Sequence, residues 1–164
     1  MGNDLAARLI ERSEIHGDFT LSSGERSSIY FDKFRFLSDP EMLREVAGAV
    51  RELIPSDVEM LASPEGAATL LLAAVSLETG KGMAVVRKEP KEYGTRALVE
   101  GEVPKGTRIA LIEDVSTTGG QTLKAARALQ GLGGEIALIV LTIDRGGGKA
   151  LREAGYRVES IAEI

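Results

Sequence analysis

The feature that most constrains this chain is an alternation of apolar strands and helices that begins near residue 58. Apolar runs predict strands at residues 58–62, 82–86, 109–112, 136–143 and 158–161. The helical runs between them lie at residues 67–79, 121–132 and 149–154. Strands that are apolar on both faces and joined by helices are typical of a covered parallel sheet. We therefore predict an α/β fold: a doubly wound, mainly parallel sheet with helices on both faces.

Two further helices are expected in the first third of the chain. One covers residues 5–15, with Gly17 at its end and His16, the only histidine, near the free carbonyl groups. The other starts at Asp39-Pro40, a capping residue followed by proline at the first helical position, and reaches about residue 53.

Between these helices the sequence predicts a hairpin. β-prone runs at residues 19–21 and 29–32 flank the turn Ser22-Ser23-Gly24. We interpret residues 1–37 as a small N-terminal hood and residues 38–164 as the α/β core.

Composition narrows the class of protein. With 164 residues, 43% of them hydrophobic, the chain is expected to form a single domain (residues 1–164). A net charge of −5 argues against nucleic-acid binding. The absence of cysteine excludes disulfides and thiolate metal sites, and one histidine argues against a zinc site or a Ser-His-Asp triad. The longest apolar run is too short to span a membrane, and no signal peptide is apparent, so we expect a cytoplasmic protein.

The stretch IEDVSTTGGQ, residues 112–121, carries the clearest functional signal. An apolar strand runs into Glu113 and Asp114, and a loop of small and hydroxyl residues precedes a helix. Gly119 and Gly120 permit a tight turn with exposed N–H groups, which together with the helix N-terminus form a cradle for phosphate. The loop is neither a P-loop nor a dinucleotide-binding loop, because the glycine spacing of both is absent.

The two acids require a different partner from the phosphate. Carboxylates bind hydroxyl groups or a divalent cation, and a ligand such as ribose 5-phosphate offers a diol beside its phosphate. The alternative is an ordinary loop after a strand whose acids are salt-bridged. In a doubly wound sheet, residues 62–68, 87–99 and 144–148 belong to the same rim.

Residues 88–98 are polar, charged and without clear periodicity, so we interpret them as a candidate lid. Arg87, Lys88 and Lys91 place three cations on and beside it. Such cations can neutralise an anionic leaving group, although a solvated charged loop is the common alternative.

These residues carry a resemblance. ALIEDVSTTGGQT resembles the phosphoribosyl-diphosphate signature of the type I phosphoribosyltransferases. FTLSSGERSSIYFD, RKEPKEYG followed by VEG, and IDRGGG resemble the orotate phosphoribosyltransferase branch of that family, in the same order. The resemblance implies transfer of phosphoribosyl from phosphoribosyl diphosphate to orotate in pyrimidine biosynthesis, giving orotidine 5′-monophosphate and diphosphate. It also implies Mg²⁺, carried mainly by the ligand rather than by protein side chains, and a homodimer with shared active sites.

The resemblance assigns residues as follows. Lys91, Asp114 and Arg87 match catalytic positions. The positions that match phosphoribosyl-diphosphate binding are Arg87, Lys88, Lys91, Tyr93, Glu113, Asp114, Val115, Ser116, Thr117, Thr118, Gly119, Gly120 and Gln121. Those that match orotate binding are Tyr30, Phe31, Thr117 and Arg145. Simple strand packing would also account for the two aromatics, and a capping or surface role would account for the arginine.

Three residues depart from the family pattern. Tyr93 stands where many orotate enzymes have a histidine, and Ser22 and Glu65 stand where some members have lysine. Two alternatives stay open: a phosphoribosyltransferase for another base, such as a purine, and a non-catalytic regulator that senses phosphoribosyl diphosphate. The retained lid cations Lys88 and Lys91 argue against the regulator.

Overall fold

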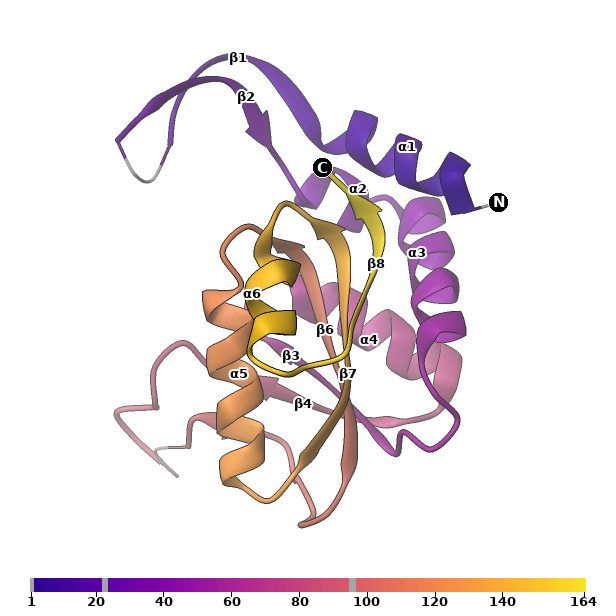
Figure 1. Cartoon of the computed structure of the whole chain (residues 1–164), viewed down its shortest axis with the longest axis vertical. Coiled ribbons are helices and arrows are strands. Elements are labelled where there is room, and N and C mark those ends of the chain that lie inside the picture. Colours follow the sequence, from indigo (N-terminus) through magenta and orange to yellow (C-terminus); the bar gives the residue numbers. More distant parts are fainter. Residues whose placement is uncertain (1, 22–23, 95–96) are drawn as a thin grey trace.

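The computed structural model describes residues 2–21, 24–94 and 97–164, and its elements follow the predicted alternation (Figure 1). The strands are β1 (Glu14–Thr20), β2 (Arg26–Phe31), β3 (Met60–Pro64), β4 (Gly82–Val86), β5 (Val99–Glu100), β6 (Arg108–Ser116), β7 (Glu135–Asp144) and β8 (Val158–Glu163). The helices are α1 (Gly2–Ser13), α2 (Phe34–Leu37), α3 (Pro40–Leu53), α4 (Ala68–Thr79), α5 (Gly120–Gly131) and α6 (Gly147–Glu153).

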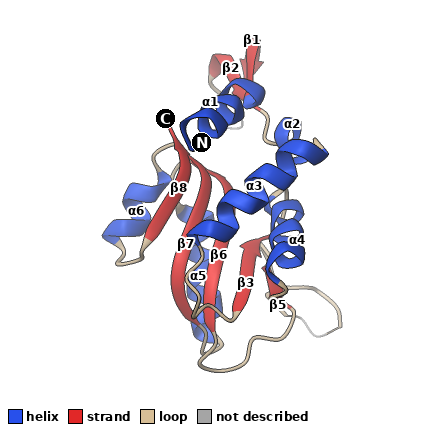
Figure 2. Cartoon of the chain, turned by 90° about the vertical axis from the view of Figure 1, so that its right-hand side faces the viewer, coloured by secondary structure: helices blue, strands red, loops and turns tan. Residues whose placement is uncertain are grey.

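The central sheet is mainly parallel and covered on both faces. Within the described residues its strand order is β5-β4-β3-β6-β7-β8, and only the short edge strand β5 runs antiparallel. Figure 2 shows α3 and α4 on one face and α5 and α6 on the other. Consecutive strand residues point to opposite faces, so Ala110 and Ile112 pack with α3 and α4, while Ile109 and Leu111 pack with α5 and α6. The predicted doubly wound α/β class is confirmed.

The sheet changes its winding direction between β3 and β6, which are hydrogen-bonded neighbours. After β3 the chain passes into α4 on one face, and after β6 it passes into α5 on the opposite face. The two connections diverge and leave a crevice beyond the carboxyl ends of the strands, which is where open α/β sheets bind ligands. We therefore expect the ligand site at the loops that follow Pro64 and Ser116.

The predicted end of the first helix is wrong. α1 ends at Ser13 and the chain enters β1, so His16 and Gly17 lie in a strand. Pairing with β2 outweighs the local helical preference, since the Ser13 carbonyl already accepts the Asp32 N–H at 2.9 Å. Gly17 lies in a break in the register, as isolated glycines in strands commonly do. The predicted hairpin is confirmed as β1–β2, although Ser22 and Ser23 lie outside the described residues.

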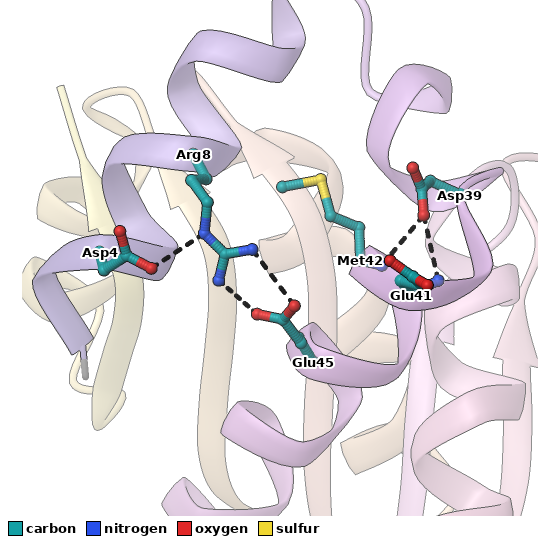
Figure 3. A network of polar contacts seen from close by, with 6 residues as sticks. All are labelled: Asp4, Arg8, Asp39, Glu41, Met42 and Glu45. Carbon is teal, nitrogen blue, oxygen red and sulfur yellow. Dashed lines mark hydrogen bonds and ion pairs between the residues drawn. The ribbon is translucent and has the colours of Figure 1, made fainter.

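Helix α3 begins as the sequence predicts. The Asp39 carboxylate accepts the N–H groups of Glu41 and Met42 at 3.0 and 3.2 Å (Figure 3). This is the side-chain cap that satisfies donors at a helix start.

Apolar contacts, more than ion pairs, attach α1 to the core. Arg8 bridges Asp4 on its own helix and Glu45 on α3 (Figure 3). These groups are exposed, and exposed ion pairs contribute little to stability because water screens them. Leu5 and Leu9 are buried in the same cluster as Val46 of α3, and a fully buried leucine contributes about 1.5–3 kcal/mol.

Candidate active site

Glu113 and Asp114 lie inside the carboxyl-terminal end of β6 rather than beyond it, because the strand continues to Ser116 instead of ending at residue 112. Their exposed fractions are only 7% and 1%. β6 pairs with β7 through Ser116 opposite Asp144, which extends the strand past the acids. The sheet therefore holds both carboxylates in place by its backbone, at the edge where the crevice opens.

The two acids have different surroundings. Glu113 accepts the Thr122 hydroxyl at 3.1 Å and the Asp114 N–H at 3.2 Å. Burial, and then the neighbouring Asp114 carboxylate, raise the pKa of Glu113 to about 8, while the bond from Thr122 partly offsets them. Asp114 lies 3.5 Å from Lys33 Nζ and accepts the Val115 N–H at 2.5 Å. The pair therefore keeps one carboxylate beside a cation and one in a setting that favours its proton.

The loop after β6 is shaped by its glycines. Gly119 has φ +78°, a region that L side chains rarely adopt, and a Cβ there would lie 2.7 Å from the Gly147 carbonyl oxygen. Thr117 and Thr118 are exposed, and the Thr118 hydroxyl accepts the Gly120 N–H at 3.3 Å. α5 starts at Gly120, so its first N–H groups and the positive end of its dipole face the loop.

A second loop, residues 144–148, packs directly on the first. The Ser116 carbonyl accepts the Arg145 N–H at 2.8 Å. A Cβ on Gly147 would lie 2.0 Å from Ser116 Oγ, so the two loops approach as closely as backbone allows. Asp144 closes the second loop by accepting the N–H groups of Gly146 and Gly148, both at 2.9 Å. The backbone of Arg145 is thereby fixed in position relative to the loop after β6.

These segments surround one cavity of about 430 Å³. Its lining comprises residues 113–122, residues 65–68, Lys33 and Lys88. Every residue from Glu113 to Gln121 that the sequence proposed for binding phosphoribosyl diphosphate therefore lies on the same cavity. A smaller cavity of about 220 Å³ adjoins it, with Arg87, Lys88 and Gln121 in its lining.

The lid residues are arranged differently. Lys91 Nζ lies 2.5 Å and Arg87 Nη1 lies 3.8 Å from Glu100 Oε1, and neither cation lines the larger cavity. Tyr93 exposes 79% of its surface. Lys88 does line the cavity, so the structure brings one of the four lid-side residues to it.

Glu65, the acid that departs from the family pattern, has a defined partner. Its carboxylate accepts the Lys88 N–H at 2.5 Å, and its own N–H donates to the Val86 carbonyl at 2.7 Å. The side chain therefore joins the turn after β3 to the base of the candidate lid. Ser22, another departure, lies outside the described residues.

The aromatic pair on β2 is divided between two environments. The Arg145 guanidinium lies over the Phe31 ring, 4.6 Å from its centroid, and this contact joins β2 to the second loop. Tyr30 points the other way, packs against Phe19 with ring centroids 5.6 Å apart, and is 45% exposed. Phe31 and Arg145 are thus brought together, and Tyr30 is not part of that contact.

The sequence did not indicate three residues that contact residues assigned to the site: Lys33, Thr122 and Glu100. Thr122 directly follows the last residue of the predicted loop, so extending the predicted site into the first turn of the helix would have included it. Lys33 follows β2 closely in sequence, but no local pattern relates it to Asp114. Glu100 belongs to the quoted VEG segment, where its charge alone did not indicate a partner.

A dedicated metal cage is absent from the described part of the chain. No group of three or more His, Cys, Asp or Glu side chains there is arranged to hold a metal ion. The oxygen donors of Glu113 and Asp114 on the cavity nevertheless suit Mg²⁺, which often keeps most of its ligands as water or substrate phosphate.

Comparison with known proteins decides the family. The orotate phosphoribosyltransferase of Thermococcus gammatolerans is 41% identical over 158 residues, covering 93% of this chain and 84% of the relative. This chain belongs to the orotate phosphoribosyltransferase family. No family model matches the chain.

Solved structures of family members agree in fold. Orotate phosphoribosyltransferase from Aeropyrum pernix has a TM-score of 0.84 and 32% identity, covering 98% of this chain and 93% of that one. The Mycobacterium tuberculosis enzyme in complex with 5-phospho-α-D-ribosyl 1-diphosphate has a TM-score of 0.81 and 28% identity, covering 99% and 95%. Among the described residues of this family member, no helix is long and apolar enough to cross a membrane.

Proposed function

We propose that this chain transfers the 5-phosphoribosyl group from phosphoribosyl diphosphate to orotate, giving orotidine 5′-monophosphate and diphosphate. One observation carries the proposal: a chain whose relatives are orotate phosphoribosyltransferases over nearly its whole length has two buried acids and a Thr/Gly loop on one cavity. The reaction is a step of pyrimidine biosynthesis.

The cavity supports specific roles for its residues. Glu113 and Asp114 would bind the ribose hydroxyls, and residues 115–121 would hold the 5-phosphate through hydroxyl and N–H donors. The transition state of ribosyl transfer carries positive charge on the sugar. Asp114, the carboxylate held beside Lys33, would stabilise that charge without having to reorient.

The leaving diphosphate would be bound by the cations at the lid. Lys88 lines the cavity, and we assign Arg87, Lys91 and Tyr93 to the same group of contacts. Mg²⁺ would enter with phosphoribosyl diphosphate, since Mg²⁺ is commonly bound through substrate phosphates together with one or two carboxylates. When bound, the metal would neutralise part of the diphosphate charge.

Orotate is a flat ring with a carboxylate, and the contact between Phe31 and Arg145 provides an aromatic surface and a cation side by side. We assign both to the base site, with Thr117 on the adjoining loop. Tyr30 is kept in the assignment as an aromatic of the hood, on the opposite face of β2. A purine acceptor is less well supported, since the relatives named above are orotate enzymes.

We propose a homodimer in which each lid acts at the partner's site, and a cytoplasmic enzyme without nucleic-acid or membrane partners. Residues 1–37 would act as a hood that supplies Phe31 and Lys33 to the site formed mainly by residues 38–164.

A base panel tests the reaction. The purified chain is incubated with phosphoribosyl diphosphate and Mg²⁺ plus orotate, uracil, adenine, guanine or xanthine, and diphosphate release is followed. Release with orotate alone is the expected result. Release with a purine instead would reassign the acceptor, and silence with every base would favour a regulator that binds phosphoribosyl diphosphate without catalysis.

A further inference from the structure

Two of the cations assigned to the leaving group share one carboxylate. Glu100 Oε1 lies 2.5 Å from Lys91 Nζ and 3.8 Å from Arg87 Nη1. The three side chains are only partly exposed, at 37%, 29% and 34%. The Lys91 contact is an ion pair by distance rather than a well-aligned hydrogen bond, and Arg87 Nε is buried without a hydrogen-bond partner in the described residues. Both cations therefore keep donor capacity that Glu100 does not use.

The backbone places Glu100 at this point. In the antiparallel β4–β5 ladder, Glu100 is opposite Val85, so Arg87 is its diagonal neighbour on the same face. The Arg87 N–H continues the ladder by donating to the Leu98 carbonyl at 2.8 Å. Gly101 ends it with φ +96°, and a Cβ there would lie 2.9 Å from the Met83 carbonyl oxygen. The sheet edge thus sets the position of the Glu100 backbone and the face of β5 on which its side chain lies.

The other acids nearby have different contacts. The Glu65 carboxylate accepts the Lys88 N–H, and Glu89 pairs with Lys124 at 3.6 Å. Glu102, two residues beyond Glu100, is exposed and has no ion pair in the described part of the chain. Glu100 is therefore the acid that pairs with Lys91 and Arg87, and Glu102 provides a matched control.

We propose that Glu100 is a positioning residue that holds Lys91 and Arg87 before substrate binds and competes with the diphosphate group for them. This inference rests on the proposed function, which assigns those two cations to the leaving group. A single carboxylate is a weak competitor for a group with several negative charges, so diphosphate displaces it. Binding of diphosphate then includes the free-energy cost of separating the two cations from Glu100. That cost weakens diphosphate binding and helps the product leave.

The test measures the affinity of magnesium diphosphate by calorimetry for the wild type, Glu100→Gln and Glu102→Gln. Removing the competing charge is expected to tighten binding about three- to tenfold in Glu100→Gln, the range for a partly exposed ion pair. Glu102→Gln is expected to bind as the wild type does. Glu100→Asp keeps the charge and is expected to stay within about twofold of the wild type.

A double-mutant cycle separates competition from a structural effect. In a Lys91→Met background the tightening by Glu100→Gln should fall below about twofold, because its main partner is gone. A Glu100→Gln protein that binds diphosphate no more tightly than Glu102→Gln, or that changes affinity equally in both backgrounds, would overturn the inference. Failure of the wild type to bind magnesium diphosphate would contradict the proposed function itself, and the inference with it.

Discussion

Asp114, at the end of β6, exposes 1% of its surface, whereas Tyr93, in the candidate lid, exposes 79%. β6 pairs with β7 along these acids, Thr122 of α5 donates a hydrogen bond to Glu113, and both acids line a cavity. The cations Arg87 and Lys91 pair instead with Glu100 of the edge strand β5. Under the proposed roles, the residues assigned to ribose and phosphate are already held by the fold, whereas Arg87 and Lys91 would have to leave Glu100 in order to bind diphosphate.

Lys91→Ala is expected to have the largest effect, since it removes a positive charge that we assign to the leaving diphosphate. We expect turnover to fall about 10²–10³-fold, as when one electrostatic stabiliser of a transition state is lost. Binding of phosphoribosyl diphosphate should change much less, because the contacts of β6 and its loop remain. Steady-state kinetics together with equilibrium binding measure both, with Lys105→Ala as an exposed control. Turnover within a few-fold of the wild type would remove Lys91 from the catalytic group.

Arg145→Ala tests the preorganised side at the base. Losing a charged partner of the orotate carboxylate is expected to raise the KM for orotate about 10–100-fold. The KM for phosphoribosyl diphosphate should stay nearly constant, since the loop after β6 does not depend on this side chain. Arg44→Ala, an exposed arginine on α3, is the control. An equal rise in both KM values would show that Arg145 supports the loops rather than the base.

Gly147→Ala tests how rigid the joined loops are. The added Cβ would lie 2.0 Å from Ser116 Oγ, so one loop has to move, and we expect a loss of about 1–3 kcal/mol in unfolding free energy. Gly131→Ala, at the end of α5 with open space around it, should be neutral or stabilise by up to about 1 kcal/mol. Urea unfolding compares the two. Equal unfolding free energies for the two variants would show that the joined loops accommodate the added Cβ without loss.

Glu113 adds a smaller, pH-dependent effect. Its pKa is raised from 4.5 to about 8, so the folded protein holds the proton more tightly than the unfolded chain does. Its contribution to stability is therefore fully present below about pH 4.5 and is lost as pH rises through about 8.

The measurement is the unfolding free energy in urea between about pH 5 and pH 9. The decrease toward high pH should be steeper for the wild type than for Glu113→Gln, which cannot ionise. Parallel curves for the two proteins would show that burial does not hold a proton on Glu113.

Much of the core could be predicted because its signals are local. The α3 helix appears where Asp39-Pro40 indicated, and α4 ends at Gly80 with φ +68°, as a C-terminal glycine requires. The loop after β6 was predicted to hold phosphate from its own residues, and these residues do line one cavity. Such patterns depend on residues within about one turn of backbone, so the packing of distant segments does not change what they predict.

The errors concern contacts between distant segments. The first helix was predicted past Ser13, but pairing of β1 with β2 ends it there. Neither β5 nor its Glu100 contact with Lys91 was predicted, because a two-residue strand exists only through its neighbour β4.

The sequence by itself determined the α/β class, the place of the acids at a strand end and the chemistry of the loop that follows, because periodicity, charge and glycine spacing are local properties. Only the tertiary structure decided that Lys33 meets Asp114, that Phe31 rather than Tyr30 meets Arg145, and that Glu100 meets Lys91. Each of those contacts depends on strand register and on which face a side chain takes. Those are set when distant segments pack together.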